Sequence, residues 1–262
     1  MSSATRQMAQ NLSHAILNQN DLETVQAGAP AYLIMLDSLI QGDSENTDML
    51  VSASKLYAAY TSAFVKDEAR AKRLAQKSHD YAYRALCLEL QQVCQVLDAK
   101  TDDLIPILGT IPASQQSILY AYASAWATWI QANTDDWNAI AQIPKLEAMF
   151  NRSIELDENY DTGNAHLYLG VLAAQIPPAL GGKPDIARAH FEKAQQISRG
   201  QNLMVNVLFA EHYARLIFDQ QLHDELLQSV IDNESNPENL VLVNTLARHR
   251  AAELLKESNE FF

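Results

Sequence analysis

Cysteine, glycine and proline are scarce in this sequence. Its 262 residues include 2 Cys, 8 Gly and 8 Pro, and no Asn-Gly or Asp-Gly turn separates two apolar segments. No segment alternates strictly between apolar and polar residues with the Val, Ile and Thr content that is typical of strands. Because most Gly and Pro fall where apolar helices would end, these absences predict an all-α fold.

Basic charge and long apolar runs are also lacking. The 19 Lys and Arg residues are outnumbered by 32 Asp and Glu, and the net charge of -13 would repel nucleic acid and anionic lipid headgroups. The most apolar segment, residues 30–40, contains Asp37 and is shorter than the ~20 residues that span a bilayer. We therefore expect no nucleic-acid partner and no transmembrane segment, and interpret residues 30–40 as a buried helix.

Catalytic and metal-binding motifs are not found either. The seven His residues form no His-x3-His or His-Glu-x2-His pattern, and neither Cys has a His at zinc-ligand spacing. Lys183 follows two Gly residues, but Pro184 stands where a phosphate-binding loop needs Ser or Thr. The sequence predicts no enzyme activity, no metal and no cofactor.

The two cysteines, Cys87 and Cys94, fall on one predicted helix. Seven residues at 1.5 Å each place them about 10 Å apart along the helix axis. This separation exceeds the reach of a disulfide, so both residues are predicted to be packed thiols. Thiols of this kind do not indicate a redox compartment.

The most informative segment carries a small-large-small spacing. Ala187, Phe191 and Ala194 follow the pattern Ala-x3-Phe-x2-Ala, with which one helix of a tetratricopeptide pair packs on its neighbour. The two Ala residues leave room for a facing helix, and the ring fills the gap between them. An apolar helix is predicted at residues 164–174, so the two segments form one helix pair.

Weaker patterns predict further pairs, because one pair hides only part of its apolar face and needs stacked neighbours. The predicted pairs are residues 50–64 with 75–86, 117–132 with 146–156, 164–174 with 187–194, and 203–218 with 222–231, followed by a last helix at 246–255. We predict a tetratricopeptide-like α-solenoid of about four irregular pairs with additional N- and C-terminal helices. It would comprise a helical cap at residues 1–46 and a single continuous repeat domain at residues 47–262.

An aromatic face marks the predicted helix at residues 117–132. It is formed by Tyr120, Tyr122, Trp126 and Trp129. Such a face either packs in the core or lines a ligand pocket on the inner surface of a solenoid. The pattern is the same in both cases, so both interpretations stay open.

Glu211 and Arg215 lie one turn apart in a helix that is otherwise rich in apolar residues. Their order, with Glu before Arg, favours an ion pair on the helix surface. A buried charge needs a partner, so we interpret them as an ion pair that braces adjacent repeats. The alternative is that both side chains point into a groove or a subunit contact.

The most specific block of the sequence is Pro177-Pro178-Ala179-Leu180-Gly181-Gly182-Lys183-Pro184. With this block and several others, the chain resembles the T-component family of tripartite ATP-independent periplasmic (TRAP) transporters. The similarity extends over residues 30–39, 56–65, 165–173, 187–194, 201–204 and 210–215, and so covers most of the chain.

The resemblance implies a tetratricopeptide-like protein of the periplasm, secreted or lipid-anchored, without enzymatic activity. It further implies association with the substrate-binding P subunit of the transporter and a homotrimer around a pore with apolar clefts. We therefore expect a scaffold that docks the P subunit and holds an apolar or organic-acid ligand. The alternative is a general tetratricopeptide adaptor that binds a peptide or protein on its concave face.

Residues 1–6 show neither the basic nor the apolar segment of a secretory signal, and no lipobox is seen. This leaves open a cytoplasmic protein and a protein whose signal has been replaced by an expression start. The resemblance favours the periplasm.

The proline- and glycine-rich loop is expected to be ordered in advance of binding. Pro177 and Pro178 fix φ, Gly181 and Gly182 allow positive φ, and Pro184 fits the first turn of the next helix. Leu180 and Lys183 flank the two glycines. The loop would either set the angle between two helices or form part of the surface offered to the P subunit or a neighbouring subunit.

Overall fold

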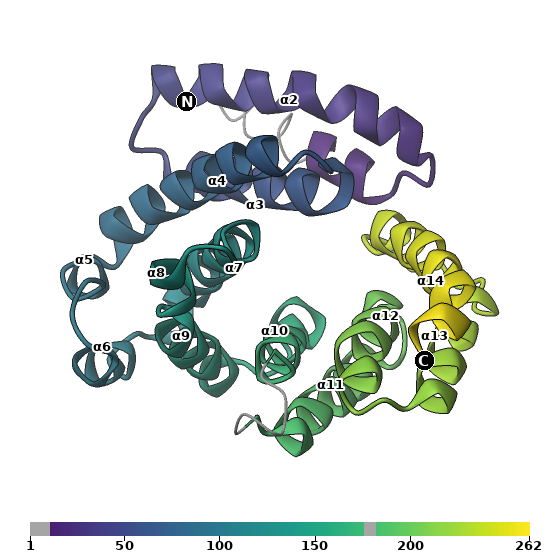
Figure 1. Cartoon of the computed structure of the whole chain (residues 1–262). Coiled ribbons are helices and arrows are strands. Elements are labelled where there is room, and N and C mark those ends of the chain that lie inside the picture. Colours follow the sequence, from purple (N-terminus) through teal and green to yellow (C-terminus); the bar gives the residue numbers. More distant parts are fainter. Residues whose placement is uncertain (1–10, 176–181) are drawn as a thin grey trace. The chain divides into compact units, whose positions relative to one another are not determined.

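The computed structural model describes residues 11–175 and 182–262. The chain forms two compact units, which are called here the central unit (Gln26–Glu158) and the C-terminal unit (Met1–Val25 with Asn159–Phe262). Within the described residues all regular secondary structure is helical, so the predicted all-α class is confirmed (Figure 1). The division into a cap at 1–46 and a repeat domain at 47–262 stays a prediction, as does the tetratricopeptide-like character of the repeats.

The central unit is built from paired helices. Its elements are α2 (Leu22–Gly42), which begins just before the unit, α3 (Thr47–Phe64), α4 (Glu68–Glu89), α5 (Gln91–Cys94), α6 (Thr101–Leu108), η1 (Ala113–Gln115), α7 (Gln116–Ala132), α8 (Trp137–Ile140) and α9 (Ile143–Leu156). Helix α3 packs on α4, α4 packs on α7, and α7 packs on α9. Side-chain caps fix the starts of α3 and α4, because Asn46 and Asp67 accept hydrogen bonds from the backbone N–H of Met49 and Arg70.

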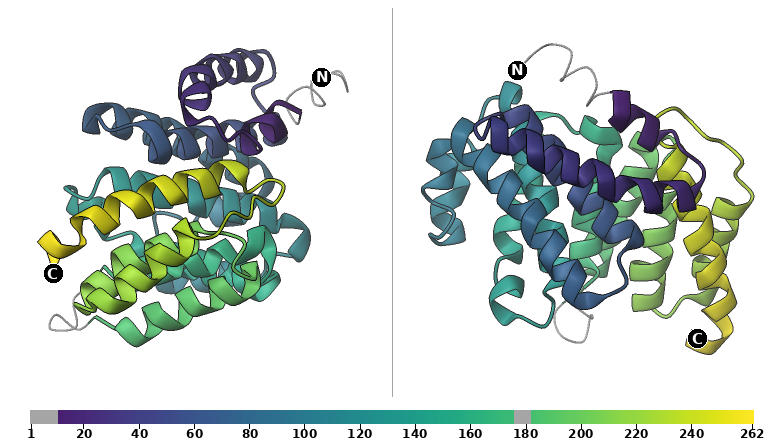
Figure 2. Two further views of the ribbon diagram at one scale, coloured as in Figure 1. Left: turned by 90° about the vertical axis from the view of Figure 1, so that its right-hand side faces the viewer. Right: turned by 90° about the horizontal axis from the view of Figure 1, so that it is seen from above.

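The C-terminal unit has a second set of packed helices (Figure 2). Its elements are η2 (Tyr160–Gly163), α10 (Asn164–Ala173), α11 (Pro184–Ser198), α12 (Met204–Leu208), η4 (Phe209–Ala214), α13 (Gln220–Ile231) and α14 (Val241–Phe261). Helix α10 packs on α11, and α13 packs on α14. The element η4 is a π-helical turn, so the segment predicted as one helix at 203–218 changes its pitch midway.

The small-large-small spacing works as the sequence suggests. Ala187, Phe191 and Ala194 are completely buried on α11. A Cβ on Gly170 would lie only 3.1 Å from the Phe191 ring, so this glycine lets α10 approach closely. Phe191 also stacks on Phe209, with ring centroids 4.9 Å apart. One aromatic ring thus joins α10, α11 and η4.

The prediction for the two cysteines is wrong. Helix α4 ends at Glu89, and the completely buried Leu90 adopts φ -127° and ψ 54°, so a new helix begins at Gln91. The turn brings the Cα atoms of Cys87 and Cys94 to 5.1 Å, and the two residues form a disulfide. The error came from extending one helix through Leu90.

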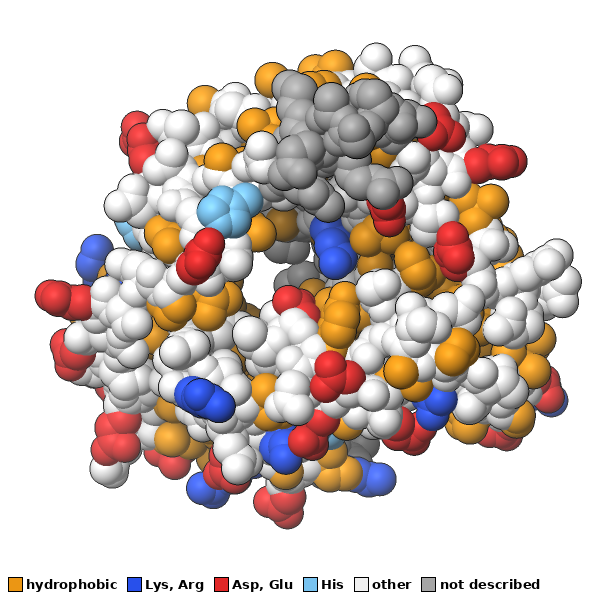
Figure 3. Space-filling model, turned by 180° about the vertical axis from the view of Figure 1, so that it is seen from behind, with side chains coloured by type: hydrophobic (Ala, Val, Ile, Leu, Met, Phe, Trp, Pro, Cys, Tyr) orange, Lys and Arg blue, Asp and Glu red, His pale blue; other side chains and the backbone are white. Residues whose placement is uncertain are grey.

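The apolar segment at residues 30–40 lies within α2, and Leu33, Leu36 and Ile40 are buried, as predicted. None of the described helices combines the length and the apolarity needed to cross a membrane. On the face shown in Figure 3, acidic side chains are spread widely and the basic ones lie scattered among them.

Candidate functional site

Helices α4 and α7 of the central unit create an aromatic cleft of about 280 Å³. His79 and Tyr83 lie four residues apart on α4, and therefore on one face. Opposite them, α7 presents Tyr122, Trp126 and Trp129. The complete lining is His79, Tyr83, Leu97, Asp98, Tyr122, Trp126, Trp129 and Gln142, which we call the aromatic cleft.

The imidazole of His79 lies among the aromatic rings of the cleft. Its centroid is 5.4 Å from that of Tyr122, 5.7 Å from Trp129 and 6.2 Å from Trp126. The Nε2 atom is hydrogen-bonded to the Tyr122 hydroxyl at 3.2 Å. The indole N–H of Trp129 donates to Oε1 of Gln76 at 2.6 Å, which fixes the direction of this ring. The rings are therefore held in position before any ligand arrives.

Charge in the aromatic cleft is of one sign. Burial lowers the pKa of His79 to about 4, so its ring is neutral at pH 7. Burial, together with the negative charge of Asp98, raises the pKa of Tyr122, which stays protonated. Among the lining residues, Asp98 is then the one charged side chain, and it is exposed to solvent. The cleft combines aromatic faces with a single carboxylate.

Three of the four aromatic residues singled out in the sequence, Tyr122, Trp126 and Trp129, line the cleft. Tyr120 lies in the core instead, 4% exposed, with its ring edge-on to that of Phe150. The sequence reasoning missed His79, Tyr83, Leu97, Asp98 and Gln142 as lining residues. The spacing of His79 and Tyr83 could have suggested one aromatic face, but no sequence signal links them to Asp98.

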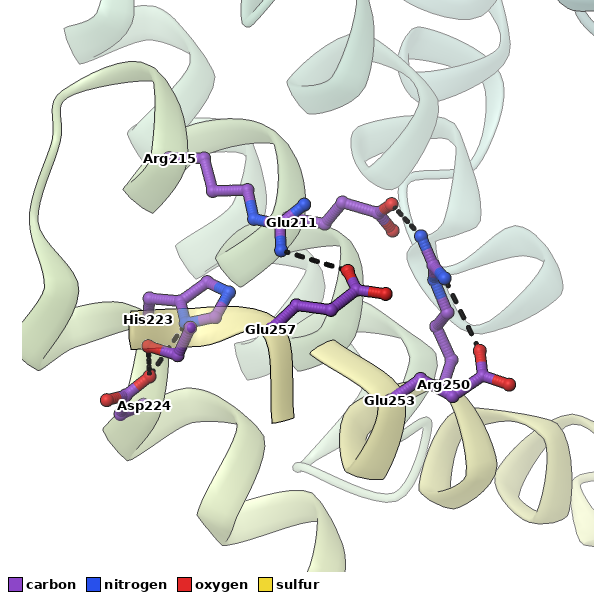
Figure 4. Close-up of polar contacts among 8 residues, drawn as sticks. Glu211, Arg215, His223, Asp224, Arg250, Glu253 and Glu257 are labelled. Carbon is purple, nitrogen blue, oxygen red and sulfur yellow. Dashed lines mark hydrogen bonds and ion pairs between the residues drawn. The ribbon is translucent and has the colours of Figure 1, made fainter. Parts of the chain in front are cut away.

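Glu211 and Arg215 do not pair with each other, so that prediction is wrong (Figure 4). Glu211 accepts a hydrogen bond from Arg250 of α14. The guanidinium of Arg215 lies 3.7 Å from a carboxylate oxygen of Glu257, also on α14, and 4.4 Å from the ring centroid of Phe261. The π-helical turn changes the register of Glu211 and Arg215, and α14 offers each a partner of opposite charge.

The charged cluster of the C-terminal unit is largely self-neutralised. Arg250 also pairs with Glu253 at 3.4 Å, so each guanidinium has an acidic neighbour. Nearby, the fully buried His223 is hydrogen-bonded to Asp224 at 2.8 Å, and the Asp224 carboxylate accepts a second bond from Ser258 of α14. The cluster, defined as Glu211, Arg215, Arg250, Glu253 and Glu257, connects η4 and the following residues to α14.

The proline- and glycine-rich loop lies largely outside the described residues. The residues of the loop that lie outside the described ranges include Pro177, Pro178, Leu180 and Gly181. Gly182 is half-buried and Lys183 is exposed, and α11 begins at the next residue. The two interpretations of the loop therefore stay predictions.

A histidine pair, His166 on α10 and His190 on α11, was not anticipated because the two residues are 24 positions apart. Their Nδ1 atoms are 2.9 Å apart. Burial and the neighbouring His166 lower the pKa of His190 to about 4. The described residues contain no group of three or more His, Cys, Asp or Glu placed to hold a metal. The pair joins two packed helices.

Comparison with known families gives one clear result. The model of the TRAP transporter T-component family matches residues 18–262, nearly the whole chain. No curated protein shows significant similarity to the sequence. The match includes both the aromatic cleft and the charged cluster.

Proposed function

Because the chain belongs to the T-component family of TRAP transporters, we propose that it is a non-catalytic scaffold that docks the solute-binding P subunit. The observation that carries this proposal is the family match over nearly the whole chain. Members of this family are accessory proteins of transporters. A helical repeat protein is suited to docking because its stacked helices present an extended surface.

The proposed location is the periplasm. The family is associated with a location outside the cytoplasm or at the membrane. The disulfide between Cys87 and Cys94 supports this location, because disulfides persist in oxidising compartments and are rare in the cytosol. Alkylation of freshly prepared periplasmic extract, with mass analysis of the Cys87 and Cys94 peptides, would test it. Mostly unmodified, bonded cysteines are expected, and fully alkylated thiols would contradict the proposal.

The proposed docking surface includes the loop before α11. Gly182 and Lys183, the described residues of this loop, are at least partly accessible, as a contact surface requires. Tagged protein would be used to capture partners from an envelope extract at low and moderate salt. A periplasmic solute-binding protein in near-equal amount is expected. Capture of cytoplasmic proteins alone would favour the tetratricopeptide adaptor instead.

A homotrimer is the proposed assembly. The chain has a mass of 29.2 kDa, so light scattering during size exclusion should give about three times this value. A mass near that of one chain would contradict the trimer. The Gly181→Ala, Gly182→Ala double variant would then separate the roles of the loop. Lost partner binding with unchanged melting temperature supports a contact surface, and a lowered melting temperature supports a purely structural loop.

Ligand binding is the remaining part of the proposal. The family resemblance suggests an apolar or an organic-acid ligand, and the aromatic cleft offers the walls for an apolar one. Its volume of about 280 Å³ is near the lower limit of small-molecule pockets, so the ligand would be small. An organic acid would meet Asp98 and no basic lining residue, which disfavours this class at the cleft.

A further inference from the structure

We propose that the aromatic cleft binds a small organic cation, such as a quaternary ammonium compound. The inference names the class of ligand that the scaffold would hold. Its role in solute uptake rests on the proposed function. The binding itself depends only on the cleft. It can therefore be tested on the isolated protein without a transporter partner.

The first argument is the nature of the walls. Aromatic rings carry negative charge on their faces, and they attract a cation that lies within about 6 Å of the ring centroid. Tyr83, Tyr122, Trp126 and Trp129 come from two packed helices and line one small space. Neighbouring rings are close enough to act together, since the centroids of Tyr122 and Trp126 are 5.3 Å apart. A methylated ammonium group fits such walls because its methyl groups contact rings without losing hydrogen bonds.

The second argument is charge. Asp98 is the one charged residue of the lining at neutral pH, and Asp80 on α4 acts electrostatically on His79 from nearby. The basic residue Lys145 does not line the cleft. Its ammonium group is buried and donates to the backbone carbonyl of Leu97 at 2.6 Å. The charge of the lining side chains therefore favours a positive ligand, and the Lys145 ammonium behind Leu97 is the one opposing charge among these residues.

The third argument is preorganisation. The disulfide fastens the segment after α4, which carries Leu97 and Asp98, to the end of α4. The Tyr83 hydroxyl lies 3.5 Å from Sγ of Cys94, and so one wall residue contacts the disulfide itself. A site whose parts are already fixed loses less conformational entropy when a ligand binds. This covalent link places Asp98 beside aromatic residues that are distant from it in sequence.

A matched series of three probes tests the ligand class by titration calorimetry on the oxidised full chain. Choline, 3,3-dimethylbutan-1-ol and 3,3-dimethylbutanoate have similar shapes and carry a positive, a neutral and a negative group. We expect choline to bind at least about tenfold more tightly than the alcohol, and the carboxylate to bind most weakly. Equal or tighter binding of the alcohol, tighter binding of the carboxylate, or no binding of choline would each overturn the proposal.

Two variants with matched controls locate the site. Trp129→Leu should weaken choline binding by about five- to thirtyfold, whereas Trp137→Leu, which removes an indole that is 85% exposed outside the cleft, should not change it. Asp98→Asn should weaken binding by about three- to tenfold, with Asp102→Asn on α6 as its exposed control. Equal effects of a cleft variant and its control would contradict this site.

Stability measurements keep the test valid if a variant is impaired. Each variant's melting temperature is compared with that of the parent, and Tyr83→Leu, at a side chain that is 41% exposed, replaces Trp129→Leu if the latter unfolds. Choline binding by Tyr83→Leu at parental strength would argue against the cleft. If the parent chain binds no choline but captures a P subunit, this inference alone is overturned. If the parent chain binds choline but captures no P subunit, the docking function alone is overturned.

Discussion

The aromatic cleft of the central unit and the charged cluster of the C-terminal unit both contain residues that the sequence marked as candidate binding residues. The surroundings of these residues differ between the two regions. In the cluster, the charges of Glu211 and Arg250 are satisfied within the protein, and Arg215 lies beside Glu257. In the cleft, the exposed carboxylate of Asp98 and aromatic side chains of α4 and α7 line a space of about 280 Å³. The comparison teaches that charged or aromatic residues support a binding site where they line a cleft, and a structural brace where their partners are side chains of another helix.

The largest expected effect comes from removing the disulfide beside the aromatic cleft. The double variant Cys87→Ser, Cys94→Ser should lower the free energy of unfolding by about 2–3 kcal/mol, because the cross-link restricts the unfolded chain. Choline affinity should fall as well, since the segment with Asp98 loses its tie to α4. Denaturant unfolding and calorimetry measure the two effects, and unchanged values in both would contradict this role.

The second prediction concerns the charged cluster as a brace. Arg250→Ala leaves the half-buried Glu211 without its hydrogen-bond donor and should cost about 1–3 kcal/mol of folding stability. The double variant with Glu211→Ala should cost less than the two single changes added together, because the pair acts as one unit. Additive costs in denaturant unfolding would show that the two residues do not interact.

How well the sequence predicted these two regions depends on how far apart in the sequence the contacting residues lie. Ala187, Phe191 and Ala194 lie on one helix, so their spacing was enough to predict their burial. The partners of Glu211 and Arg215 on α14 are about forty residues away, and the local i,i+4 rule named the wrong ones.

For the same reason, only the part of the aromatic cleft that lies on α7 could be predicted from the sequence. Tyr122, Trp126 and Trp129 share a helical face and could be found by their spacing. Asp98 enters the cleft only because the chain turns at Leu90, and a buried apolar residue gives no sign of such a break. Local patterns thus predicted the helices, but the break between α4 and α5 and the contacts between distant helices required the structure.

The third prediction compares the cluster with a paired charge in the central unit. Asp37 accepts hydrogen bonds from Tyr57 and Tyr81 at 2.8 and 2.7 Å and pairs with Lys77. Burial alone would raise the pKa of this carboxyl, but the bonds from Lys77, Tyr81 and Tyr57 together hold it below its ordinary value of 3.8. Its contribution to stability is therefore present above pH 3.8 and is lost as the pH falls through the lowered value.

Asp37→Asn should reduce the free energy of unfolding at pH 7. The free energy of unfolding of this variant should then fall less than that of the parent as the pH is lowered. Urea unfolding between pH 3 and pH 7 measures this change. Asp102→Asn, at an exposed site, serves as the control and should leave the profile as it is. A parental acid profile in Asp37→Asn would show that the pairing does not stabilise the fold.

The most direct test of the contrast between the two regions is to measure choline affinity and melting temperature in Asp98→Asn and Arg250→Gln side by side. The account predicts that Asp98→Asn loses about three- to tenfold in affinity at an unchanged melting temperature. Arg250→Gln should keep parental affinity and melt at a lower temperature. Parental affinity in Asp98→Asn, or an unchanged melting temperature in Arg250→Gln, would contradict the account.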